Sequence, residues 1–117
     1  MSNHIDRGKI GESIAVNFLI GKDYYILERN FRSKTGEIDI IALKGDMLIF
    51  VEVKTRTSID YGYAYEAVNR KKQRRIMNTA FYYIKFNRMK GYQLRFDIIE
   101  VYLGKIKKIN HYENAFV

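Results

Sequence analysis

The sequence predicts a single α/β domain in which helices flank a central mixed β-sheet, in the order α-β-β-β-α-β-β. Two observations lead to this fold class. Two segments repeat apolar residues at helical spacing, and five shorter segments are rich in β-branched and aromatic residues. One helix, three strands, a second helix and two more strands are typical of one sheet with helices packed on it. The 117 residues fit one domain spanning residues 1–117, and the 47% hydrophobic content supports a real core.

The first helix is expected from Asp6 to Ile20, because Asp6 is a good capping residue and Gly21 can end a helix. Its predicted apolar stripe contains Ile10, Ile14 and Phe18, with Ala15 and Leu19 as neighbours. A strand is then expected over residues 24–31, followed by a polar turn over residues 32–36.

The next two strands are expected over Glu37–Leu43 and Met47–Lys54, joined by a type II′ turn at Gly45 and Asp46. Counting outward from this turn pairs Lys44 with Met47, Leu43 with Leu48 and Ile41 with Phe50. The same count places Asp39 opposite Glu52 and Glu37 opposite Lys54. This register therefore gathers three carboxylates and a lysine on one face of the hairpin.

Apolar residues surround this polar group on both faces of the predicted hairpin. Ile41, Leu43, Leu48 and Phe50 share its face, and the opposite face is expected to carry Ile38, Ile40, Ala42, Ile49, Val51 and Val53. Carboxylates crowded at such a surface need a cation or hydrogen bonds to stay ionised, and oxygen ligands suit Mg²⁺ or Mn²⁺ better than zinc. The alternative is a Glu37–Lys54 cross-strand ion pair, with the other two acids in solvent.

A loop is expected over residues 55–62 and a long helix over Ala64–Asn87, with Ile76, Ala80, Tyr83 and Ile84 at core spacing. Two further strands are expected over residues 94–103 and 105–111, separated by a turn at Gly104. The tyrosines at positions 61, 63 and 65 could stack on unpaired bases, but packing in the core or the loop is favoured for each of them.

The charge balance favours a polyanionic partner. Lys and Arg number 21 against 13 Asp and Glu, a net charge of +8, which indicates nucleic acid ahead of a membrane surface. Candidate phosphate contacts are Lys34, Arg56, Arg70, Lys71, Lys72, Arg74 and Arg75. The alternative for the helical ones is a solvated face. The absence of cysteine excludes disulfides and thiol chemistry, and we expect a cytoplasmic protein without membrane spans.

The segments Gly36–Ala42 and Phe50–Arg56 resemble the acidic, then acidic-x-Lys signature of the restriction-endonuclease-like, or PD-(D/E)xK, superfamily. Nearly the whole chain is similar to the YraN family of small proteins. This closer likeness includes Gly11-Glu12, residues 28–32, 95–97 and 114–116.

The resemblance implies a nuclease fold similar to that of Holliday-junction resolvases. It assigns Glu12, Asp39, Glu52 and Lys54 as catalytic residues, and Mg²⁺ or Mn²⁺ ligands from Glu12, Asp39, Glu52 and the Val53 carbonyl. Glu37 becomes a partner of Lys54 or an additional ligand. The resemblance favours DNA over RNA as the partner. It also implies that the protein could act as a homodimer, as resolvase-like enzymes commonly do.

Three functions remain open from the sequence. The first is a metal-dependent endonuclease that hydrolyses phosphodiester bonds of branched or structured DNA. The second is a catalytically inactive nucleic-acid-binding module on the same scaffold. The third is a protein-interaction factor whose acidic cluster is structural.

Overall fold

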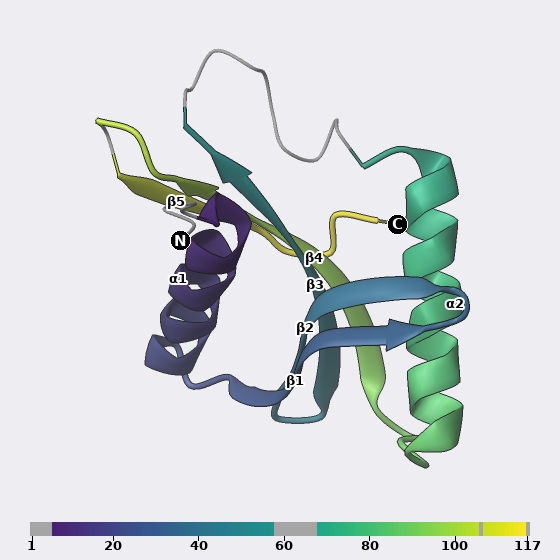
Figure 1. The fold of residues 1–117 in the computed structure, drawn as a ribbon. Coiled ribbons are helices and arrows are strands. Elements are labelled where there is room, and N and C mark those ends of the chain that lie inside the picture. Colours follow the sequence, from purple (N-terminus) through teal and green to yellow (C-terminus); the bar gives the residue numbers. More distant parts are fainter. Residues whose placement is uncertain (1–5, 58–67, 106, 117) are drawn as a thin grey trace, which may run out of the picture.

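A five-stranded mixed sheet carries one helix on each face in the computed structural model, which describes residues 6–57, 68–105 and 107–116 (Figure 1). The elements are α1 (Arg7–Gly21), β1 (Tyr25–Ser33), β2 (Gly36–Lys44), β3 (Met47–Arg56), α2 (Arg70–Phe86), β4 (Gln93–Tyr102) and β5 (Lys108–Tyr112). The strands lie in sequence order, and all neighbours are antiparallel except β3 and β4, which are parallel. The predicted fold class and element order are confirmed.

Helix α1 begins after Asp6, whose Oδ1 accepts a hydrogen bond of 3.1 Å from the Lys9 backbone N–H. Its predicted inner stripe is displaced by about one residue, since Ile10 is 41% exposed. The buried positions are Gly11, Ala15, Val16 and Leu19, and the predicted Ile14 and Phe18 pack against this core while partly buried. The reason is close packing on β3. A Cβ on Gly11 would collide with the Thr55 side chain, so the smallest residue of the helix faces the sheet.

Helix α2 starts at Arg70, later than the predicted Ala64, because Asn69 has an extended backbone and caps it. The Asn69 Oδ1 accepts a 2.9 Å hydrogen bond from the Lys72 backbone N–H. Residues 58–67 lie outside the described residues. They include most of the expected loop, the start of the expected helix, and Tyr61, Tyr63 and Tyr65. The predicted core positions are confirmed, with Ile76, Ala80 and Tyr83 buried and Ile84 packed against them.

Each of the five strands differs from its expected bounds by one to three residues at one or both ends, and β1 continues through Ser33 into the expected polar turn. Strand β3 continues past Lys54 through Arg56, because Thr55 and Arg56 pair with β4. Strand β5 starts at Lys108 and not at Lys105, while residue 106 lies outside the described part. Neither helix in the described part is long and apolar enough to cross a bilayer.

The register of the β2–β3 hairpin is confirmed near the turn. Lys44 lies opposite Met47, Leu43 opposite Leu48 and Ile41 opposite Phe50. Gly45 has φ +60° and Asp46 has no positive φ, as a type II′ turn requires. The ladder, however, ends with Ile40 opposite Val51. The expected pairs of Asp39 with Glu52 and Glu37 with Lys54 are therefore not ladder pairs.

Beyond Ile40, strand β2 leaves β3 and continues with β1 toward α2 (Figure 1). The turn after β1 contacts the helix, where the hydroxyl oxygens of Thr35 and Thr79 lie 2.8 Å apart. This bend also corrects one face assignment. Ile38 joins the core under α2, whereas Ile40 belongs to the core under α1, because the strand rotates as it bends.

A buried polar network ties β5 to the sheet on the far side from this bend. The fully buried Asp97 carboxylate lies 2.7 Å from His111 Nε2, and it accepts hydrogen bonds from Arg95 and from the Asn114 backbone N–H. Burial opposes ionisation of Asp97, but these donors outweigh it and lower its pKa. Because Arg95, Asp97 and His111 satisfy one another's hydrogen bonds, we interpret this network as structural.

Candidate active site

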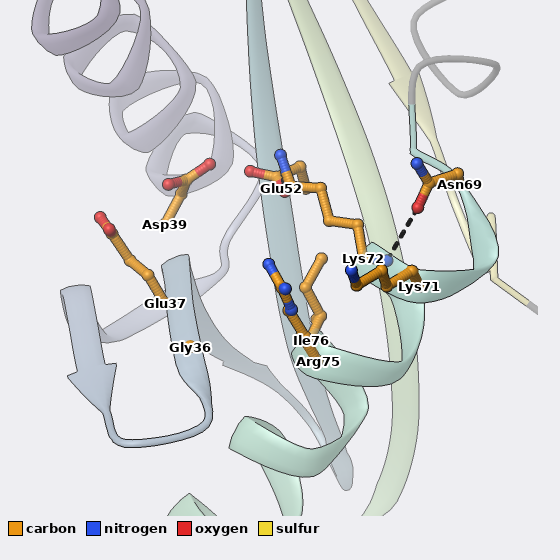
Figure 2. Close-up of a pocket in the computed structure, with 9 residues that line it drawn as sticks. All are labelled: Gly36, Glu37, Asp39, Glu52, Asn69, Lys71, Lys72, Arg75 and Ile76. Carbon is orange, nitrogen blue, oxygen red and sulfur yellow. Dashed lines mark hydrogen bonds and ion pairs between the residues drawn. The ribbon is translucent and has the colours of Figure 1, made fainter.

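The divergence of β2 from β3 opens a cleft of about 540 Å³ in front of the first turns of α2 (Figure 2). One wall carries acidic side chains from the two strands, and the other carries basic side chains from the helix. The lining residues are Gly36, Glu37, Asp39, Glu52, Asn69, Lys71, Lys72, Arg75 and Ile76. The predicted hairpin acids and three of the predicted basic residues thus share one cleft.

Asp39 lies at the point where the two strands separate. Separation deprives the Val53 backbone N–H of a partner on β2, and the Asp39 Oδ2 accepts this N–H at 2.8 Å. A buried N–H without a partner is costly, so this side chain completes the ladder in place of the backbone. The hydrogen bond also fixes where the carboxylate points, which is toward Glu52 and into the cleft.

Asp39 and Glu52 form a close carboxylate pair. Burial raises the pKa of Asp39 from 3.8 to about 8, and the neighbouring Glu52 adds to the rise through a shared hydrogen bond and charge repulsion. The Val53 N–H opposes this rise, and Glu12 contributes to it more weakly. With no cation bound, Asp39 therefore holds a proton at neutral pH and donates it toward Glu52.

Two lysines accompany this pair. Lys72 reaches across the cleft from α2, and its Nζ lies 3.0 Å from the Glu52 Oε2 (Figure 2). Burial lowers the pKa of Lys54, and the adjacent Lys72 lowers it further. Burial would also lower the pKa of Lys72, but its contacts with Lys54 and Glu52 outweigh this and raise it. Lys72 is thus the cationic partner of Glu52, while Lys54 is the lysine more easily deprotonated.

The other two predicted acids, Glu37 and Glu12, lie outside the Asp39–Glu52 pair. Glu37 bonds Arg32, with 3.3 Å between Oε2 and Nε, and not Lys54 as the hairpin count suggested. Glu12 lies half-buried on α1 and, with Glu37, lines a small adjoining pocket. Within residues 6–57, 68–105 and 107–116, no three His, Cys, Asp or Glu side chains converge into a group that could hold a metal ion. Two carboxylates can still hold Mg²⁺ when water or phosphate supplies the remaining ligands. A ligand role for Glu12, Asp39, Glu52 and the Val53 carbonyl stays a prediction.

The predicted basic residues separate into those inside the cleft and those away from it. Lys71, Lys72 and Arg75 line the cleft. Arg70 and Arg74 line a different pocket on α2, Lys34 is exposed in the turn after β1, and Arg56 is half-buried at the end of β3.

Sequence reasoning missed Asn69, which both caps α2 and lines the cleft. An Asn directly before a basic helical run is a capping signal and could have identified it.

Comparison with known proteins agrees with the likeness seen in the sequence. Residues 11–101 match the model of the uncharacterised protein family UPF0102. A UPF0102 protein of Clostridioides difficile is 51% identical over 114 residues, covering 97% of this chain and 99% of the relative. A UPF0102 protein of Caldanaerobacter subterraneus is 51% identical and covers 93% of both chains. A third, from Dictyoglomus thermophilum, is 47% identical over 97% of this chain and 99% of the relative.

Proposed function

The chain belongs to the uncharacterised protein family UPF0102, and we propose that it is a metal-dependent nuclease that hydrolyses phosphodiester bonds of DNA. One observation carries the proposal. The Asp39–Glu52 carboxylate pair faces a basic helical wall across an open cleft. A site that places acids against cations in this way can hold a divalent metal on one side and phosphates on the other.

The residues present fit a hard divalent cation such as Mg²⁺ or Mn²⁺. Asp39 and Glu52 offer only oxygen ligands, and the described part of the chain has no cysteine beside them. Burial and, after it, the neighbouring Glu52 raise the pKa of Asp39, so Asp39 keeps its proton at neutral pH when no cation is bound. A divalent cation would supply positive charge and displace the proton. Asp39 and Glu52 would hold it, with Glu12 near enough to add charge.

A bound Mg²⁺ or Mn²⁺ supplies an acidified water and neutralises negative charge on the phosphate. The protein groups do the rest. Asp39 is held in place by the Val53 N–H, which limits its motion when it ionises. Lys54 lies beside Glu52 with a lowered pKa, so its amine can orient the attacking water or donate to a phosphate oxygen.

The helical wall provides the phosphate contacts. Lys71 and Arg75 are exposed and line the cleft, so their charged ends are available to the DNA backbone. The first turn of α2 also opens on this cleft through Asn69, and the positive end of the helix dipole favours anions there. Both features bring the phosphodiester toward the acidic pair.

A cleavage assay tests the proposal with single-stranded, duplex, flapped and four-way-junction DNA in Mg²⁺ or Mn²⁺. The native protein should give metal-dependent products on at least one substrate. Asp39→Asn should reduce cleavage by about a hundredfold or more, because the amide cannot ionise to hold the cation. Glu37→Gln is the matched control, since it removes one charge from the same cleft without touching the carboxylate pair. Equal cleavage by the native protein and Asp39→Asn contradicts the proposed site.

A nucleic-acid-binding module without turnover is the second candidate. The observation that favours it is the lack of a third converging metal-binding side chain among the described residues. It predicts salt-sensitive DNA binding that is the same in the native protein and Asp39→Asn, and no products with either metal. The same set of DNA substrates, measured by fluorescence anisotropy, separates the two candidates.

A further inference from the structure

We propose that Lys72 is a resident counter-ion of the site, which holds Glu52 in the metal-free protein and moves to a nucleic-acid phosphate when a divalent cation binds. This inference rests on the proposed function and adds a coupling between its two ligands. Lys72 is then a positioning residue, since it acts on the metal through the availability of Glu52.

The geometry of Lys72 supports the first half of this exchange. Its Nζ lies 3.0 Å from the Glu52 Oε2, and the Glu52 side chain is only 10% exposed. A carboxylate this buried loses much of its hydration and needs a cation to remain charged. The protonated Asp39 can donate a hydrogen bond toward Glu52 but carries no positive charge, so it does not neutralise the Glu52 carboxylate. Lys72 therefore fills the need that a metal would otherwise meet.

The freedom of Lys72 supports the second half. Its side chain is 42% exposed, and the Asn69 cap holds only the Lys72 backbone, so the ammonium can leave Glu52 without disturbing the helix cap. A divalent cation on Glu52 would bring like charges together, which disfavours the ammonium at its present position. Lys71 and Arg75 line the same cleft, so a phosphate bound by them would lie within the region that the Lys72 side chain can reach (Figure 2).

This exchange has a thermodynamic consequence. Without nucleic acid, the cation must displace Lys72 from Glu52, which weakens its binding. When the Lys72 ammonium pairs with a phosphate instead of Glu52, this cost disappears and the divalent cation binds more tightly. Linkage makes the effect reciprocal, so the cation strengthens phosphate binding by the same factor. Lys72 then ensures that the metal is held most firmly when the polyanion is present.

Isothermal titration with Mn²⁺ tests the exchange in the absence of nucleic acid. Lys72→Met should bind Mn²⁺ about tenfold more tightly than the native protein, a typical size for coupled sites. Lys71→Met is the matched control, because it removes the same charge from the neighbouring position of the same cleft wall, and its affinity should change less than about threefold. Lys72→Arg keeps a cation beside Glu52 and should retain the weak native affinity.

A second titration uses saturating phosphorothioate DNA. It should strengthen Mn²⁺ binding about tenfold in the native protein and leave Lys72→Met nearly unchanged.

The outcomes separate this inference from the proposed function. If the native protein, Lys72→Met and Lys71→Met all bind Mn²⁺ with one affinity, the role of Lys72 is overturned and the metal site stands. If none of them binds Mn²⁺ at millimolar concentration, the metal site itself is refuted, and the exchange with it. Tighter binding by both variants equally would reduce Lys72 to a general charge effect and also overturn the exchange.

Discussion

Replacing Asp39 with Asn should stabilise the metal-free protein at neutral pH. Asp39 is partly buried beside Glu52, and its pKa is raised to about 8. Ionising it in the folded protein therefore costs free energy that an uncharged amide at this position avoids. Asn keeps the shape of the protonated acid. Its oxygen can still accept from the Val53 N–H, and its NH₂ group can donate to Glu52 as the proton does now.

The size of the effect follows from the pKa values. A rise from 3.8 to about 8 corresponds to about 6 kcal/mol at about 1.4 kcal/mol per unit. Asp39 is partly exposed, so solvent screening reduces this, and we expect about 2 kcal/mol in the free energy of unfolding. The folded state holds the extra proton between these pKa values. The stability contributed by protonated Asp39 is therefore complete below about pH 4 and is lost as the pH rises through 8.

Chemical denaturation of the metal-free native protein and Asp39→Asn, from pH 4 to 9 in EDTA, measures this difference. The variant should gain stability relative to the native protein as the pH rises, and its free energy of unfolding should be higher by about 2 kcal/mol near pH 8. Glu37→Gln, which alters an exposed acid paired with Arg32, should show no comparable trend. A native protein that gains stability relative to Asp39→Asn across this range would refute the reasoning.

The other predictions concern the two helices. Gly11→Ala should cost about 2 kcal/mol in the free energy of unfolding, because its Cβ would collide with Thr55 and push α1 off the sheet. Gly21→Ala in the same helix meets no atom within 4 Å and should stabilise by about 0.5 kcal/mol through helix propensity, so equal effects in urea denaturation would contradict the packing argument. Asn69→Ala should cost about 1 kcal/mol by uncapping α2, and should also loosen the helical turn that holds Lys72, which hydrogen exchange of the Lys72 amide would detect. No faster exchange at Lys72 would argue against the cap.

The sequence predicted what depends on local pattern. The element order, the type II′ turn and the hairpin register from Lys44 to Ile41 follow from residue periodicity and turn chemistry, and the structure confirms them. The grouping of Asp39 with Glu52 also follows, because both acids lie on one face of neighbouring strands. These are properties of residues close together in the chain.

What the sequence did not predict depends on contacts between distant elements. Strand β2 separates from β3 at Asp39 because β1 and β2 bend onto α2, and no residue in the hairpin alone signals that bend. The ion pair of Glu52 with Lys72 joins residues from a strand and a helix on either side of a long connection. The charge of Lys72 suggested a phosphate contact, and only the fold shows that it already has an acidic partner.

The parallel pairing of β3 with β4 has a consequence for the order in which the site is completed. The acidic wall belongs to a hairpin with a two-residue turn, which can form from local contacts soon after its residues leave the ribosome. The basic wall arrives only when α2 packs on the sheet and β4 closes the crossover beside β3. A partly made chain therefore carries the carboxylates without the helix that balances them. We therefore expect the full arrangement of charges to form late in folding.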